Sequence, residues 1–191
     1  MLILKKEVSI LVFDLNIGGT EKVMVNLANY LSNNNCNVNI LMIGKNNYLK
    51  RELLPNVSVI AFNKNRIYSS LIDIIKYIRT QKIDCFISNV WPLTILTVIA
   101  GFFKRSFNKK KLVLVEHCHL EREFSSFSAP FKFFQKISIY VFYRFASKVV
   151  AVSDGVKEDL CLNKGVNEEK VIVIHNPVDV NFSIMKYENK A

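Results

Sequence analysis

Continuous apolar runs alternate with helical patterns along the whole chain. The runs are rich in Val, Ile and Leu, which is typical of strands that are covered on both faces of a parallel sheet. They predict strands at residues 9–13, 37–43, 57–62, 84–88, 112–116, 148–153 and 171–175. Helices are predicted at residues 19–33, 67–81, 92–104, 130–146 and 153–162. This alternation predicts a doubly wound, mainly parallel, Rossmann-like α/β sheet with helices on both faces.

The spacing of apolar residues also predicts which face of each helix packs inward. For the first helix the inward residues would be Val23, Leu27, Tyr30 and Leu31. For the helix at 67–81 they would be Ile67, Leu71, Ile74, Ile75 and Ile78. For the helix at 130–146 a stripe packed on the sheet would contain Phe134, Ile137, Val141 and Phe145. Ser153 is a suitable N-cap for the last helix, with Asp154 in its first turn.

Length, charge and cysteines narrow the class of protein. A chain of 191 residues suits one ordinary domain. Its four cysteines form no Cys-x-x-Cys pair, which favours reduced thiols over a disulfide framework or a zinc site. The net charge is +10, and residues 104–148 hold ten basic but only three acidic side chains. This excess points to a polyanionic partner such as anionic lipid, a phosphorylated substrate or nucleic acid. We find no apolar run long enough to span a bilayer.

Candidate ligand-binding residues follow the predicted strands. Ligands of doubly wound sheets bind outside the carboxyl ends of the strands. The residues expected at this edge are Gly18, Gly19, Thr20, Glu21, Asn89, His117, Ser153 and Asn176. Together they predict a polar rim on one edge of the sheet.

Two features of this rim have both a functional and a structural interpretation. Gly18 and Gly19 precede a helix, whose free N–H groups favour an anion such as phosphate, but glycines also serve simple tight turns. His117 could bind a substrate hydroxyl or form a structural hydrogen bond. The Gly-x-Gly-x-x-Gly fingerprint of dinucleotide binding is absent. Glu116, Cys118 and His119 are potential metal ligands without a second cluster, so we expect no metal site and no cofactor.

The stretch from 124 to 145 contains nine aromatic residues among basic ones. Basic residues beside aromatic ones suit an anionic membrane interface or a lipid-linked acceptor. The candidate residues for such a surface are Lys132, Phe133, Lys136, Tyr140 and Arg144. The alternative is that this helix is simply well buried.

Three segments carry a resemblance to a known family. The Gly18-Gly19-Thr20-Glu21-Lys22-Val23 loop, followed by Asn26-Leu27-Ala28, is similar to the first loop and helix of family 4 glycosyltransferases. Residues 150–160 are similar to its sixth strand and the following helix. Residues 171–179 resemble its last N-domain strand and the Asn-Pro-Val-Asp hinge. The segments occur in the family's order and frame nearly the whole chain.

The resemblance implies half of a two-domain GT-B enzyme. Residues 1–178 would be the N-terminal, acceptor-side domain, and residues 179–191 a hinge remnant. The family transfers sugar with retention, from a nucleotide-sugar donor and without a bound metal. Gly18 and Gly19 would then face the donor diphosphate, and His117 would lie near the donor sugar or the acceptor. The family's paired Glu-x7-Glu motif belongs to a second domain, so we expect this chain to be inactive without a C-terminal partner, which could be separately encoded.

The resemblance further predicts a glycan or lipid-linked acceptor, in polysaccharide biosynthesis. The scattered cysteines and the short apolar runs favour a cytoplasmic protein, with peripheral association on the inner face of the membrane as a further option. One alternative is a non-catalytic α/β module that docks on a membrane or a partner subunit. A nucleic-acid binder is the least favoured reading, because no nucleic-acid-binding signature accompanies the basic charge.

Overall fold

The fold is built on one seven-stranded parallel sheet. The computed structural model describes residues 5–104, 107 and 111–177. The strands are β1 (Lys6–Val12), β2 (Cys36–Met42), β3 (Val57–Ala61), β4 (Cys85–Asn89), β5 (Leu112–Glu116), β6 (Lys148–Ala151) and β7 (Val171–Val173). Every neighbouring pair is parallel, in the order β3-β2-β1-β4-β5-β6-β7. The predicted doubly wound α/β fold is thus confirmed, and all seven predicted strands are present.

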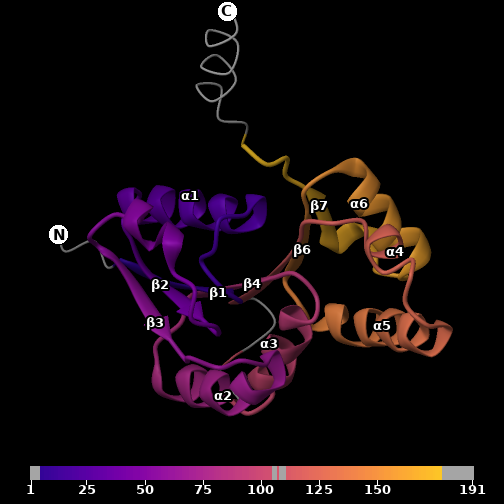
Figure 1. Cartoon of the computed structure of the whole chain (residues 1–191), viewed down its shortest axis with the longest axis horizontal. Helices are drawn as coiled ribbons and strands as arrows, with labels where there is room; N and C mark the ends of the chain where they lie inside the picture. Colours follow the sequence, from indigo (N-terminus) through magenta and orange to yellow (C-terminus); the bar gives the residue numbers. More distant parts are fainter. Residues whose placement is uncertain (1–4, 105–106, 108–110, 178–191) are drawn as a thin grey trace, which may run out of the picture.

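Helices cover both faces of this sheet. They are α1 (Gly19–Asn33), α2 (Leu71–Thr80), α3 (Leu93–Gly101), α4 (Leu120–Glu123), α5 (Ala129–Phe142) and α6 (Asp154–Glu158). Short helical turns are η1 (Tyr48–Glu52), η2 (Ile67–Ser70), η4 (Tyr143–Phe145), η5 (Asp159–Asn163) and η6 (Glu168–Lys170). Figure 1 shows α1 on one side of the sheet and α2 and α3 on the other. The strand order reverses between β1 and β4, which defines the topological switch point.

Two apolar clusters fill the two layers. The first, under α1, contains Met24, Val25 and Ala28 together with Ile10 and Val12 of β1. The second lies on the opposite face, where residues of α2, α3, α5 and α6 pack on the sheet. The predicted inward residues of the 67–81 helix are confirmed, because Ile74 and Ile78 are fully buried and the others pack against the same cluster.

The predicted inward face of α1 is wrong at Tyr30. This side chain is 65% exposed, whereas Val23, Leu27 and Leu31 are half-buried. The buried centre is made of Met24, Val25 and Ala28, so the helix is rotated from the predicted position. The apolar stripe of α1 is wider than its contact with β1 and β2, and its outer part lines a groove described below.

The predicted packing of α5 is also wrong. Phe134, Ile137 and Val141 are exposed, and of the predicted stripe Phe145 alone packs against the core. The buried face of α5 instead carries Gln135, Ser138 and Ile139. Polar contacts fix this orientation: the Trp91 indole Nε1 donates to Ser138 Oγ over 3.1 Å, and Tyr143, just beyond α5, bonds to a buried carboxyl group. The spacing of hydrophobic residues in the sequence carries no information about such polar contacts.

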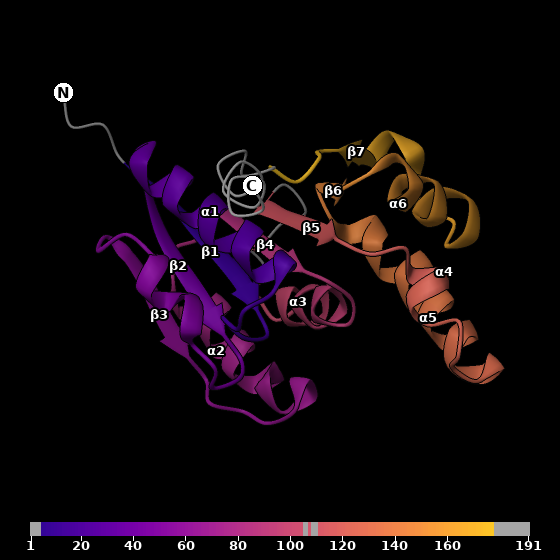
Figure 2. The ribbon, with the colours of Figure 1, turned by 45° about the horizontal axis from the view of Figure 1, so that its top comes forward.

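Figure 2 shows α4, α5 and α6 gathered at the β6 and β7 end of the sheet, away from β3. We call these three helices and η5 the α4–α6 lobe. In the described part of the chain, no helix is long and apolar enough to cross a membrane.

Candidate functional site

The parallel sheet brings the predicted rim residues to one edge. Gly18 and Gly19 follow β1, Asn89 ends β4, and His117 follows β5. Ser153 and Asn176 follow β6 and β7. Because all strands run in the same direction, their carboxyl ends lie at the same edge. Gly18, Gly19 and His117 therefore occupy the same end of the sheet, as the sequence predicts.

A hollow of about 270 Å³ lies at the switch point between β1 and β4. Thr20 and Glu21 from the first turn of α1 line it together with Asn89, beside the rings of Phe13 and Trp91. Asn89 is 4% exposed, and its Oδ1 has no hydrogen-bond partner among the described residues. A buried amide oxygen without a partner can accept a hydrogen bond from a ligand or a water molecule.

The two glycines at the start of α1 differ in their surroundings. A Cβ atom at position 18 would collide with the carboxylate of Glu21, so Gly18 leaves room for that side chain. A Cβ atom at position 19 would meet nothing within 4 Å. Gly18 is the N-cap of α1, and as a glycine it has no side chain that could accept a hydrogen bond from the first N–H groups of the helix. An anion would therefore find its free path to the helix N-terminus on the Gly19 side.

His117 lies in a second hollow, an apolar groove of about 580 Å³. Val23 and Leu27 of α1 form one wall, the sheet forms the floor, and residues 174–177 close the other side, including Asn176. Neither ring nitrogen of His117 has a hydrogen-bond partner among the described residues. Burial lowers the pKa of His117 to about 4, so the ring is neutral at pH 7. A neutral imidazole offers one donor and one acceptor.

Glu116 points to the opposite face of the sheet from His117: its carboxyl group meets Trp91 and Tyr143 of the second cluster, whereas His117 lies in the groove beside α1. It is fully buried, and the Tyr143 hydroxyl donates to its Oε1. The Trp91 backbone N–H lies 3.4 Å from its Oε2, and Thr94 Oγ1 lies 2.9 Å from the Tyr143 hydroxyl. Burial raises the pKa of Glu116 to about 7. Glu116 and His117 therefore do not converge on one metal position.

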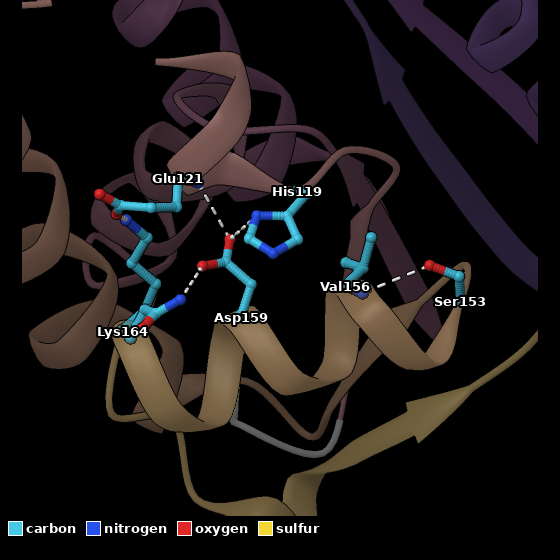
Figure 3. A network of polar contacts seen from close by, with 7 residues as sticks. His119, Glu121, Ser153, Val156, Asp159 and Lys164 are labelled. Atoms are coloured by element: carbon cyan, nitrogen blue, oxygen red, sulfur yellow. Dashed lines mark hydrogen bonds and ion pairs between the residues drawn. The ribbon is translucent and has the colours of Figure 1, made fainter. Parts of the chain in front are cut away.

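The α4–α6 lobe is held by a second polar network, drawn in Figure 3. Asp159 is almost fully buried and accepts hydrogen bonds from the Glu121 backbone N–H and from Asn163 Nδ2. His119 Nδ1 lies 3.4 Å from Asp159 Oδ2. The buried ammonium group of Lys164 reaches Glu121 over 2.9 Å. These contacts fix α4 on η5.

Ser153 has a structural role as the N-cap of α6. Its Oγ accepts a hydrogen bond from the Val156 backbone N–H over 3.3 Å, which confirms the predicted N-cap (Figure 3). Replacing Ser153 with alanine is expected to cost about 1 kcal/mol of unfolding free energy. Urea unfolding followed by circular dichroism measures this loss.

Ser128 provides the matched control, since it is the N-cap of α5 but makes no side-chain capping bond. Because Ser128 is exposed and makes no such bond, Ser128→Ala should change stability by no more than about 0.5 kcal/mol. Equal losses in the two variants would show that the Ser153 cap does not stabilise α6.

The predicted membrane or acceptor residues gather on the α4–α6 lobe. Lys132, Phe133 and Lys136 line a third hollow of about 300 Å³, which Glu121, Leu162, Asn163 and Lys164 complete. Tyr140 is half exposed, and the Arg144 guanidinium lies 5.0 Å from the centre of its ring. The structure thus separates these residues from the groove of His117 and from the hollow at the switch point.

Comparisons with known proteins identify the fold and the family. Anabaena Alr3699/HepE, solved in complex with UDP and glucose, is 20% identical, with a TM-score of 0.67 over 92% of this chain and 46% of that one. A glycosyltransferase from Rickettsia africae is 20% identical, with a TM-score of 0.63 over 98% and 50%. The lipopolysaccharide outer core galactosyltransferase WaaB, in its apo form, is 17% identical, with a TM-score of 0.56 over 91% and 46%.

This chain therefore spans about half the length of these solved structures and matches one half of the GT-B fold. No curated protein matches the sequence. The model of the family described as Glycosyltransferase Family 4 matches residues 17–182, which is most of the chain. By this match, the chain belongs to glycosyltransferase family 4.

Proposed function

We propose that this chain forms the acceptor-side half of a retaining glycosyltransferase. The enzyme moves a sugar from a nucleotide-sugar donor to a glycan or lipid-linked acceptor. The observation that carries the proposal is the family match over residues 17–182, combined with polar side chains gathered at the carboxyl edge of the sheet. The complex of HepE with UDP and glucose supports a uridine nucleotide as the first donor to test.

The N-terminus of α1 would stabilise the leaving diphosphate. Negative charge develops on the diphosphate as its bond to the sugar breaks, and preorganised N–H groups stabilise such charge. We place the diphosphate at Gly18 and Gly19, with its approach on the open Gly19 side. The Glu21 carboxylate lies against Gly18, which leaves the Gly19 side for the phosphates.

His117 would contact the donor sugar or the acceptor at the same edge. Its neutral ring has two nitrogens that find no hydrogen-bond partner in the described part of the chain, and they match the donor and acceptor character of sugar hydroxyl groups. In this role His117 orients a hydroxyl group by hydrogen bonding. Asn89 and Thr20 would supply further hydrogen bonds from the hollow at the switch point.

The active unit would include a second domain. The solved relatives are about twice as long as this chain. The apolar groove beside His117, with Val115 and Val150 on its floor, lies at the same carboxyl edge. A second domain, joined to this chain or encoded separately, would close over the carboxyl edge and supply the remaining donor contacts.

The donor edge can be tested with the chain itself by two-dimensional NMR. Millimolar UDP-glucose, UDP or inorganic pyrophosphate should shift the amide signals of Gly18, Gly19 and Thr20. Gly19→Asp should abolish these shifts, because it adds a negative charge where a Cβ meets no neighbour. An acidic residue in the first turn is also compatible with the helix dipole, so the fold should persist.

Gly155→Asp is the matched control, since Gly155 lies in the first turn of α6 and a Cβ there also meets nothing within 4 Å. This variant should show the same ligand-induced shifts as the wild type. Absence of shifts at residues 18–20, or their persistence in Gly19→Asp, would contradict the diphosphate assignment.

A further inference from the structure

The outward face of α5 is apolar. Five of its side chains are exposed: Phe133 (68%), Phe134 (62%), Ile137 (43%), Tyr140 (50%) and Val141 (36%). Leu162 of η5 is 73% exposed and lines the same hollow as Phe133. We call these six side chains the α5 surface. A helix of a globular protein normally turns polar residues to solvent, so such a contiguous apolar patch marks an interaction site.

The opposite face of α5 is already anchored. Ile139 is fully buried, Ser138 bonds to Trp91, and Phe131 packs edge-to-face on the Trp91 ring with centroids 5.6 Å apart. Rotating α5 to bury the α5 surface would break these contacts. The apolar residues therefore remain available to a partner outside the chain.

Positive charge flanks this surface. Lys132 and Lys136 are the charged residues of α5, which contains no acidic side chain. Both line the 300 Å³ hollow beside Phe133 and Leu162, where the ammonium group of Lys164 is paired with Glu121. Arg144 is exposed next to Tyr140. Aromatic and aliphatic side chains bordered by basic ones complement an interface of acyl chains and anionic headgroups.

We propose that the α5 surface docks this protein on an anionic membrane. The helix lies in the plane of the interface, with Phe133, Phe134 and Ile137 inserted at the level of the acyl chains. Lys132, Lys136 and Arg144 then contact lipid phosphates, while tyrosine at position 140 suits the boundary between the two layers. This inference stands on the α5 surface and the basic residues beside it, and does not require sugar transfer by the chain.

Flotation of the 191-residue chain with vesicles tests the proposal. The chain should float with vesicles of phosphatidylcholine and phosphatidylglycerol, and much less with phosphatidylcholine alone. Two double variants, Phe133→Ser with Ile137→Ser and Lys132→Glu with Lys136→Glu, should each lower binding at least about tenfold. All four side chains lie on the outer side of the lobe, and circular dichroism verifies that the variants remain folded.

Matched controls lie on α2, which is on the same side of the sheet as α5 but is separated from it by α3 (Figure 1). Ile72 is 65% exposed there and Lys76 is exposed. A double variant, Ile72→Ser with Lys76→Glu, should bind vesicles like the wild type. An equal loss of vesicle binding in this control variant would show that binding depends on the overall charge of the protein and not on the α5 surface, and would overturn the proposal. Absence of flotation with anionic vesicles would also overturn the proposal. Self-association of the chain that Phe133→Ser with Ile137→Ser abolishes would overturn it as well, since a second copy of the chain would then cover the α5 surface.

Discussion

Replacing Glu116 with glutamine is expected to remove a contribution to the unfolding free energy that falls by about 3 kcal/mol between pH 4.5 and 7. The pKa of Glu116 is about 7 in the folded protein against an ordinary value of 4.5, because its carboxyl group is buried. Between these values the unfolded chain has released a proton that the folded protein still holds. The contribution of Glu116 is therefore fully present below pH 4.5 and is lost as the pH rises through 7. Glutamine carries no titrating proton, and its amide oxygen can still accept from the Tyr143 hydroxyl.

Urea unfolding of both proteins across this pH range measures the difference. The stability of Glu116→Gln relative to the wild type should rise with pH and level off above pH 7. Glu123→Gln, at an exposed position of α4, controls for the loss of one carboxyl group. A constant difference between Glu116→Gln and the wild type would show that Glu116 titrates alike in the folded and unfolded chains.

Replacing His117 with asparagine is expected to remove a pH dependence of opposite sign and similar size, up to about 3 kcal/mol. Burial lowers the pKa of His117 from 6.5 to about 4. Between these values the unfolded chain binds a proton that the folded protein does not. The contribution of His117 is therefore present above pH 6.5 and is lost as the pH falls toward 4. Because Glu116 and His117 have opposing slopes, the wild type should show little net change between pH 4.5 and 6.5 from these two groups.

Each single variant should then reveal the slope of the other residue. Glu116→Gln should become more stable with rising pH below 6.5, and His117→Asn should become less stable over the same range. NMR titration of the imidazole protons checks the pKa of His117 directly. His175→Asn serves as the control, because the His175 side chain is 71% exposed. A pKa near 6.5 for His117 in the folded protein would contradict the expectation.

The strands were predictable because a parallel sheet covered on both faces needs continuous apolar runs, and the seven runs are continuous in sequence. The positions of the main helices were predictable too, because helical spacing of apolar residues separates these runs. The orientation of α5 was not, because it depends on polar bonds to Trp91 and Glu116 from other parts of the chain. The apolar stripe at Phe134, Ile137 and Val141 therefore reads as a core face but lies in solvent.

The sequence predicts which residues lie at the carboxyl edge of the sheet, but not how they are distributed between two separate hollows. Parallel strands necessarily bring the residues after β1, β5 and β7 to one side, so the place of His117 and Asn176 follows from topology. Which residues share a hollow depends on side-chain directions, such as Asn89 facing Thr20 and Glu21. Glu116 escaped notice as a buried titrating group because its partner Tyr143 lies 27 residues further on. A charged residue ending an otherwise apolar strand was the one available signal.

The strand order also has a consequence for how the chain assembles during synthesis. β1 leaves the ribosome first, but one of its two neighbours, β4, starts only at Cys85. Until then, the nascent chain exposes an open backbone edge on β1, where incorrect pairing can occur. From β4 onward each new strand adds to the outer edge in order of translation, through β5 and β6 to β7. A pause in translation once β4 has emerged from the ribosome would therefore favour a three-layered nucleus of α1, β1–β4 and α2 before the α4–α6 lobe has emerged.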